Sequence, residues 1–149
     1  MNVLLVQREG VDLYQTLLAS ETSRMILRFY RPSALDFGVV VRGASLGGSL
    51  SLVSELKWYI RRYVALVLFE FADGQYCTHA LAREAYEREI RLQEPWPFRR
   101  LVGIRDGHLE HSVVLDAPAS PEAYAAFAAG MDTVLEVLIT GAEAGEKED

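Results

Sequence analysis

The run from Tyr63 to Phe71 constrains the fold more than any other part of the sequence. It reads YVALVLFEF and is followed by Asp73-Gly74. A membrane-spanning helix needs about 20 apolar residues, so this shorter run predicts a central β-strand buried on both faces. Asp-Gly between two apolar runs indicates a tight hairpin. The segment Gln75–Ala80 is therefore the expected returning strand.

A second Asp-Gly, at Asp106-Gly107, predicts the clearest hairpin of the chain. Its expected strands are Phe98–Arg105 and His108–Leu115. The register of a two-residue loop then follows from simple counting. It places Ile104 opposite Leu109, Val102 opposite His111, and Arg105 opposite His108.

Hydrophobic spacing predicts the other elements. They are a strand at Val3–Val6, a helix at Val11–Ala19, strands at Ser23–Tyr30 and Leu35–Arg42, and a helix at Ala82–Gln93 that is ended by Glu94-Pro95-Trp96-Pro97. The segment Leu50–Arg62 fits both a strand and a helix, and a helix is favoured. The segment Ala44–Ser49 (ASLGGS) is expected to be a flexible loop.

A long amphipathic helix is expected to begin at Ser120-Pro121-Glu122, where each residue type suits a helix start. Its apolar face would consist of Tyr124, Phe127, Met131, Val134, Leu135 and Leu138. Gly141 is the expected end of this helix. The residues that follow would form a solvated acidic tail.

These elements together predict an α+β fold, because hairpins alternate with helices along the chain. We expect an antiparallel sheet of hairpins packed against two to four helices, the last of them long and amphipathic. The chain of 149 residues is the size of one domain. The expected organisation is a single α+β domain at 1–141 and a disordered acidic tail at 142–149.

Charge and composition narrow the classes of function. The net charge is −6, which argues against the broad phosphate contacts that dominate nucleic-acid affinity, so we do not expect direct nucleic-acid binding. Cys77 is the single cysteine, and nothing requires an oxidising compartment. The start MNVLLVQREG has no basic region before its apolar run, and no run is long enough for a membrane span. We therefore expect a cytoplasmic protein that needs no membrane and no cofactor.

Two groups of residues resemble catalytic or metal sites. In His108-Leu109-Glu110-His111, strand alternation places His108 and Glu110 on one face and points His111 away, so no metal site is expected. Cys77 and His79 share a strand face, but strand cysteines beside apolar runs are usually inert. The prediction is a protein that is not an enzyme, and whether Cys77 is reactive stays open.

A glycine-rich segment offers an alternative function. Arg24 and Arg28 have the R-x-x-x-R spacing, and the segment 43–48 (GASLGG) contains Ser45 and, three residues later, Gly48. This pattern resembles PilZ domains, which bind a cyclic dinucleotide through an arginine pair and a later serine-containing loop. The resemblance implies a small-ligand sensor that uses Arg24, Arg28 and Ser45. Gly43 stands where that motif has Asp or Asn.

Aromatic residues near arginine pairs form a candidate partner surface. The pairs are Arg61-Arg62 and Arg99-Arg100, and the aromatic residues are Trp58, Trp96 and Phe98. Such a surface also suits single-stranded nucleic acid, but the acidic net charge argues against that use.

Residues 82–140 resemble the C-terminal half of YbjN-like proteins and type III secretion chaperones. The residues that carry the resemblance are Pro97-Phe98-Arg99-Arg100, Arg105-Asp106-Gly107-His108-Leu109 and Ser120-Pro121-Glu122. It implies a non-enzymatic, chaperone-like or adaptor protein that acts as a homodimer and binds a partner protein. The implied dimer interface is Ala82, Ala85, Tyr86 and Ile90. The strand expected at Val3–Val6 and the segment 50–62 depart from the family pattern.

Overall fold

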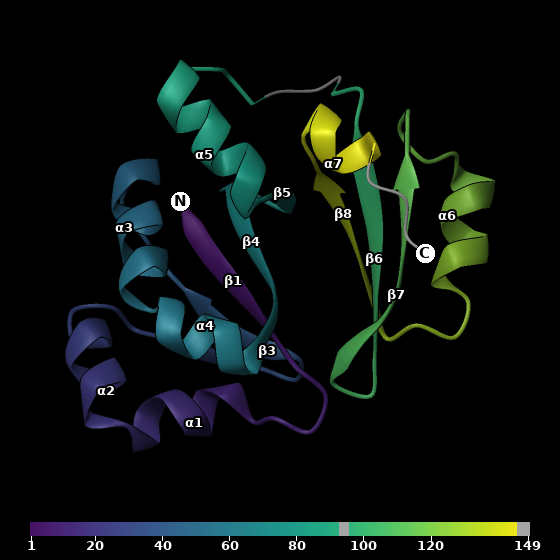
Figure 1. Cartoon of the computed structure of the whole chain (residues 1–149). Helices are drawn as coiled ribbons and strands as arrows, with labels where there is room; N and C mark the ends of the chain where they lie inside the picture. The colour runs from purple at the N-terminus through teal and green to yellow at the C-terminus, as the bar shows by residue number, and fades with distance from the viewer. Residues whose placement is uncertain (93–95, 146–149) are drawn as a thin grey trace.

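The computed structural model describes residues 1–92 and 96–145. These residues form seven helices and one eight-stranded sheet with the order β2-β3-β1-β4-β5-β8-β6-β7 (Figure 1). The strands are β1 (Asn2–Gln7), β2 (Ser33–Leu35), β3 (Gly38–Val41), β4 (Val64–Ala72), β5 (Gln75–Thr78), β6 (Arg99–Arg105), β7 (His108–Leu115) and β8 (Thr133–Leu138). The helices are α1 (Leu13–Ala19), α2 (Glu21–Leu27), α3 (Leu46–Glu55), α4 (Lys57–Tyr63), α5 (His79–Arg88), α6 (Pro121–Ala128) and α7 (Gly141–Gly145). The α+β class is as predicted.

The strand β1 lies inside the sheet, antiparallel to β3 on one side and to β4 on the other. Its side chains alternate between two hydrophobic cores, as strand geometry requires. Val3 and Leu5 belong to one core, and Leu4 and Val6 belong to the other. β4, the expected central strand, is fourth in the sheet and turns back into β5. The predicted central strand and its hairpin are confirmed.

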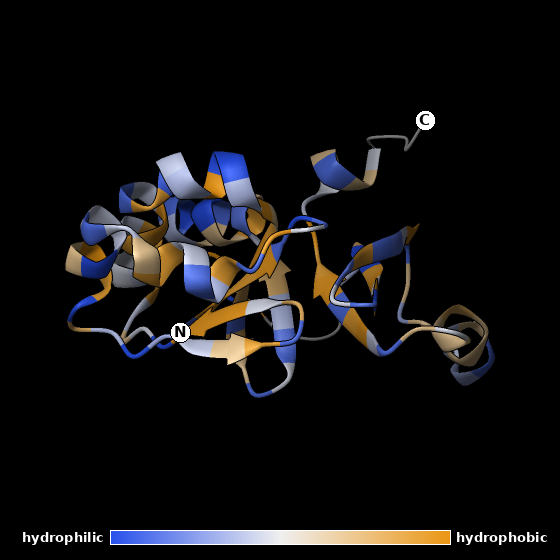
Figure 2. Ribbon diagram, turned by 90° about the horizontal axis from the view of Figure 1, so that it is seen from below, coloured by the Kyte–Doolittle hydropathy of each residue, from blue (hydrophilic) through white to orange (hydrophobic). Residues whose placement is uncertain are grey.

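The helices α1 to α5 contribute to the first core, which they share with β1, β3, β4 and β5. Leu17 of α1, Leu52 of α3 and Leu81 of α5 are each at most 2% exposed in this core. Figure 2 shows these helices gathered on one side of the strands, with α6 apart at the far end of the molecule. The N-terminal half is therefore a sheet covered by helices on one face.

The strand β8 joins the two halves of the sheet. It pairs parallel with β5 and antiparallel with β6, so this one pair departs from the predicted antiparallel sheet. Leu135 and Val137 of β8 lie with Val102 and Ile104 of β6 in the second core. That core fills the face of β1 and β4 that points away from α1 to α5.

The predicted long C-terminal helix is wrong. α6 ends at Ala128, and Gly130 has a φ of +80°, a conformation that interrupts a helix and that glycine adopts readily. The chain then forms β8, in which Leu135 faces one core and Leu138 faces the other. A run that is buried on both sides fits a helix and a strand equally well by spacing alone, and here it is a strand.

The strand predicted at Ser23–Tyr30 is also wrong, because α2 occupies most of it. Its buried residues are Ser23 and Leu27, four apart as on one helical face. Met25 and Phe29, which suggested strand alternation, are 53% and 82% exposed. The described residues form seven helices, more than the two to four that were predicted.

Other boundaries differ in detail. The ambiguous segment 50–62 is helical, since α3 and α4 meet at Leu56. Of the strand expected at 35–42, residues 38–41 form β3, which pairs with β2 just before it in the chain. α5 spans 79–88, and the predicted helix end at Gln93 and the break at Glu94-Pro95 lie outside the described residues. No helix in the described part of the chain has the length and apolar character to cross a bilayer.

The β6–β7 hairpin is confirmed, including the pairs Ile104–Leu109 and Arg105–His108. A bulge beyond them shifts the register by one, so that Gly103, and not Val102, lies opposite His111. α7 occupies the first part of the segment expected to be a solvated tail. The remainder of that segment, 146–149, lies outside the described residues.

Candidate binding groove

A groove of about 660 Å³ lies between α3, α4 and α5 on the helical side of the molecule. α4 contributes residues three and four apart, which lie on one helical face. The N-terminus of α5 is held by Thr78, whose hydroxyl accepts a hydrogen bond from the Leu81 amide at 3.2 Å. The lining residues are Gly47, Leu50, Ser51, Val53, Ser54, Lys57, Ile60, Arg61, His79, Arg83, Tyr86 and Glu87.

Three cationic side chains line the groove. Lys57 and Arg61 come from α4 and Arg83 comes from α5, and all three residues are exposed. Among the described residues, none of them forms an ion pair. Glu87 is the acidic residue among those that line the groove. The groove is thus locally positive in a chain of net charge −6.

The floor of the groove is apolar. Val53 is buried in the helical core, and Leu50 and Ile60 pack partly buried against it. The ring of Tyr86 lies beside the first turn of α3, because a Cβ at Gly47 would be 3.0 Å from its Cε1 atom. Tyr86 is 57% exposed. A ligand in this groove would meet apolar and aromatic surface below and positive charge above.

His79 adds a neutral polar group to the groove. Burial lowers the pKa of its imidazole below the ordinary value of 6.5, and the nearby Arg83 lowers it further. The ring stacks on Phe69 with centroids 5.7 Å apart. His79 is therefore uncharged at neutral pH, and the positive charge of the groove comes from Lys57, Arg61 and Arg83.

Of the four residues expected at a dimer interface, two are buried inside the chain and two reach its surface. Ala82 and Ala85 are 0% and 4% exposed and belong to the interior of the chain itself. Tyr86 is exposed and lines the groove, and Ile90, just after α5, is half-buried. Burial within the chain leaves Tyr86 and Ile90 as the members of this set that reach the surface.

The aromatic residues expected on a partner surface are also separated. Trp58 is half exposed on α4. Trp96 is partly buried, and its indole Nε1 donates to the carbonyl oxygen of Ile139 at 2.9 Å. Phe98 packs against Gly141, at which a Cβ would be 3.1 Å from the ring. Trp96 and Phe98 thus hold the start of β6 against the end of β8.

Ser45 and Arg28, which belong to the PilZ-like pattern, interact with residues close to them in the sequence. The hydroxyl of Ser45 caps α3 by accepting a hydrogen bond from the Gly48 amide. Arg28 follows α2, and its guanidinium lies 4.7 Å from the ring centre of Phe29. Among the described residues, no hydrogen bond or ion pair joins Arg24, Arg28 and Ser45. The R-x-x-x-R pair lies on and after a helix, where that spacing places both side chains on one face.

Cys77 is fully buried in β5, and burial raises the pKa of its thiol to about 12, with a further contribution from Glu143. No hydrogen bond between Cys77 and His79 exists in the described structure. The thiol is protonated at neutral pH, and the thiolate is the nucleophilic form. The two residues therefore form no nucleophile–base pair in this structure.

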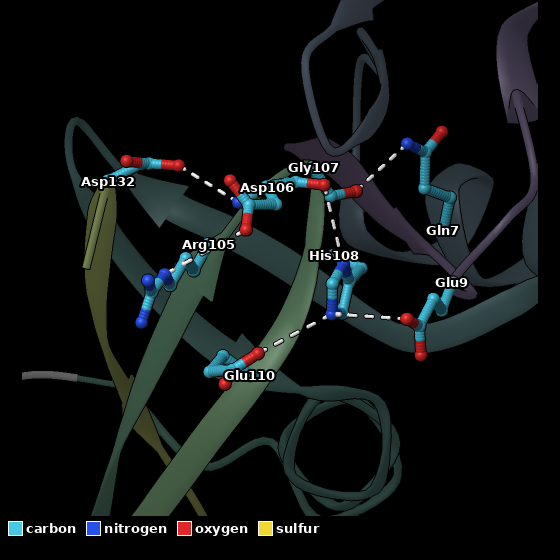
Figure 3. A network of polar contacts seen from close by, with 8 residues as sticks. All are labelled: Gln7, Glu9, Arg105, Asp106, Gly107, His108, Glu110 and Asp132. Atoms are coloured by element: carbon cyan, nitrogen blue, oxygen red, sulfur yellow. Dashed lines mark hydrogen bonds and ion pairs between the residues drawn. The ribbon is translucent and has the colours of Figure 1, made fainter. Parts of the chain in front are cut away.

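The histidines of the β6–β7 hairpin point in different directions, as expected. His108 Nε2 lies 3.5 Å from the Glu110 carboxylate and 3.9 Å from that of Glu9 (Figure 3). His111 stacks on Phe127 of α6 with centroids 5.4 Å apart. Among the described residues there is no cluster of three or more His, Cys, Asp or Glu side chains suited to a metal ion.

The groove cations were missed by the sequence interpretation, apart from Arg61, which was noted as half of an arginine pair. The usable signal was the helical spacing of Lys57 and Arg61, four apart. Arg83 lies 22 positions after Arg61, and only the packing of α5 beside α3 and α4 brings it to the same groove.

The fold and this groove define an α+β protein whose mixed eight-stranded sheet carries its candidate binding site on the helical layer. The chain belongs to a family of unknown function, DUF5804, whose match covers residues 1–104. The matched part contains α3, α4 and α5, and therefore every residue that lines the groove. No curated protein and no solved structure matches the chain.

Proposed function

We propose that this protein is a non-enzymatic binding module of the chaperone-like or adaptor kind, which holds an acidic segment of a partner protein in the groove between α3, α4 and α5. The observation that supports this proposal is the set of three cations without ion pairs among the described residues, above an apolar floor, in a chain of net charge −6. The buried, protonated Cys77 supports the non-enzymatic part.

The groove suits an acidic peptide for two physical reasons. Arginine forms charge-assisted, often bidentate hydrogen bonds with carboxylates, and both Arg61 and Arg83 are exposed and available for them. Complementary charge also speeds association and disfavours wrong partners. The apolar floor and Tyr86 would contact side chains between the acidic residues, and large aromatic residues often dominate such contacts.

The proposal includes a homodimer. Of the set that the sequence suggested, Ile90 reaches the surface without lining the groove, so an interface just after α5 would be built around it. Multi-angle light scattering at micromolar concentration should give the mass of two chains. The mass of one chain would overturn the dimer. It would not bear on the groove, which the next experiment tests.

Fluorescence anisotropy with a labelled decaglutamate peptide tests the groove. We expect Arg61→Ala/Arg83→Ala to weaken binding at least about tenfold, which is about 1.4 kcal/mol, and added salt to weaken binding by the wild type. The matched control, Arg24→Ala/Arg28→Ala, removes two arginines at α2 and should change affinity less than about twofold. Equal weakening by both double variants, or no binding by the wild type, would refute the proposal.

The alternative proposal is a sensor that binds a cyclic dinucleotide through Arg24, Arg28 and Ser45. The same variants separate it from the first proposal. In calorimetry with cyclic diguanylate, heat that is lost in Arg24→Ala/Arg28→Ala but retained in Arg61→Ala/Arg83→Ala would favour the sensor. An absence of heat with the wild type would exclude it for this ligand.

A further inference from the structure

A second hollow, of about 720 Å³, lies on the other side of α4, where this helix faces α1 and α2. Three of its lining residues are aromatic, namely Trp58, Tyr59 and Tyr63, and its acidic residue is Glu55. No Lys or Arg of residues 1–92 and 96–145 lines it. The charge of its lining is therefore opposite to that of the groove between α3, α4 and α5.

The aromatic rings are held in a fixed arrangement. Trp58 lies edge-to-face with Tyr59 and with Tyr63, at centroid distances of 4.9 and 6.3 Å. Tyr59 is buried, and its hydroxyl shares a 2.6 Å hydrogen bond with Ser20. In an edge-to-face pair the edge of one ring meets the face of the other, so each pair covers only one ring face.

The carboxylate of Glu55 is exposed and forms no hydrogen bond or ion pair with a described residue. Trp58 already attracts a cation, because the Arg62 guanidinium lies 3.8 Å from its ring centre. Arg62 does not line the hollow, so it does not fill the space between the rings and Glu55. Aromatic faces beside a carboxylate form the usual environment for an organic cation.

Three hydroxyl groups of the pocket, those of Thr16, Ser20 and Tyr59, have partners within the chain. Ser20 is bonded to Tyr59, and Thr16 donates to the carbonyl oxygen of Asp12 at 2.8 Å. A primary ammonium group brings three N–H donors that need acceptors, whereas a quaternary ammonium group brings none. A methylated cation can therefore be held by the rings and by the charge of Glu55 alone, without hydrogen bonds from the ligand.

We infer that this pocket binds a small quaternary ammonium compound of the choline type, with its cation against Trp58 and Tyr63 and its charge balanced by Glu55. This function goes beyond the proposed acidic-peptide groove and does not depend on it. Charge complementarity identifies the ligand class, since the described lining offers a carboxylate and aromatic side chains and no Lys or Arg. Arg62 lies on the ring of Trp58 but is not part of that lining.

Calorimetric titration with choline tests the inference, with 3,3-dimethyl-1-butanol as its uncharged isostere. We expect choline to bind at least about tenfold more tightly than the isostere, because the cation–π and Glu55 contributions require charge. Glu55→Gln should weaken choline binding at least about fivefold, and Trp58→Leu should abolish it. Trp58→Phe, which keeps an aromatic face, should retain most of the binding.

Two control variants make the outcome specific. Glu87→Gln removes an exposed acid of α5, in the groove on the other side of α4, and should leave choline affinity unchanged. Arg61→Ala/Arg83→Ala should also leave it unchanged. Equal affinity for choline and its uncharged isostere would overturn the inference, and so would the absence of choline binding or wild-type affinity in Glu55→Gln. Circular dichroism of each variant confirms that it is folded.

Discussion

Gln7 Nε2 donates a hydrogen bond to the carbonyl oxygen of Gly107 at 2.9 Å and so joins the end of β1 to the tip of the β6–β7 hairpin (Figure 3). The same amide nitrogen donates to Asp36, and the Gln7 side-chain oxygen accepts from the Leu13 amide. One side chain therefore fastens the turn between β2 and β3, the start of α1 and the C-terminal hairpin together.

Replacing Gln7 should destabilise the whole fold. Gln7→Ala removes three hydrogen bonds, and we expect the free energy of unfolding to fall by about 2 kcal/mol. Urea denaturation followed by circular dichroism measures this change. The control is Gln15→Ala in α1, whose side chain is exposed and which should cost less than about 0.5 kcal/mol. Equal effects of the two substitutions would contradict the fastening role of Gln7.

Gly38 should not tolerate any side chain. A Cβ at this position would lie 1.8 Å from the backbone carbonyl oxygen of Leu5 in the neighbouring strand β1. Because backbone is the obstacle, no rotamer change relieves the clash, and Gly38→Ala should cost about 3 kcal/mol or more. A Cβ at Gly145 in α7 would meet no atom of the described residues within 4 Å, and Gly145→Ala should be neutral. Thermal denaturation of both variants provides the comparison, and a stable Gly38→Ala would show that β1 and β3 are farther apart.

Arg99 should be a strong stabiliser of the join between β6 and β8. Its guanidinium is 3% exposed, lies 3.1 Å from the Glu136 carboxylate and donates to the carbonyl oxygen of Trp96 at 2.7 Å. Glu136→Gln removes the carboxylate charge that lies 3.1 Å from Arg99 Nη1, and the loss of one charge from a largely buried pair costs about 3 kcal/mol. Arg88→Ala, which breaks the exposed pair with Glu84, should cost less than about 0.5 kcal/mol. Guanidinium denaturation should rank the two in this order.

The buried thiol of Cys77 should make stability fall at alkaline pH. Its folded pKa is about 12, whereas an unfolded thiol titrates near about 8.5. Between these values the unfolded state has lost a proton that the folded state keeps, so the free energy of unfolding decreases as pH rises, by at most about 1.4 kcal/mol per pH unit.

Comparison with Cys77→Ala isolates this contribution, because the other titrating groups are common to both proteins. The stability advantage of the wild type over the variant should shrink from pH 9 upward. Iodoacetamide should label Cys77 in the denatured protein and not in the folded one. Rapid labelling of the folded protein at pH 8 would contradict the buried, protonated thiol.

Local signals predicted the parts of the fold that depend on short-range geometry. The two Asp-Gly hairpins and the central strand β4 were of this kind, because a turn and its flanking apolar runs are adjacent in sequence. β8 was predicted wrongly, since its apolar residues fit two periodicities and the choice depends on neighbours far along the chain. α2 was missed because the exposed Met25 and Phe29 imitated strand alternation.

The candidate site was less predictable than the fold. Trp58 was identified as a surface aromatic residue and does line the second hollow. Arg61 and Arg83 come together only through the packing of α5 beside α3 and α4, which no spacing in the sequence encodes. Trp96 was assigned to the same surface as Trp58, but its indole is directed to the backbone of Ile139.

The position of β8 has a consequence for how the chain acquires its structure. β5 is complete at Thr78, but its second neighbour, β8, does not exist until residue 138 has been synthesised. Until then the nascent chain has an open strand edge at β5, and β6 lacks one of its two partners. Pairing across such sequence distances is slow to form. The last third of the chain therefore closes a strand edge of the kind that templates aggregation while it is open.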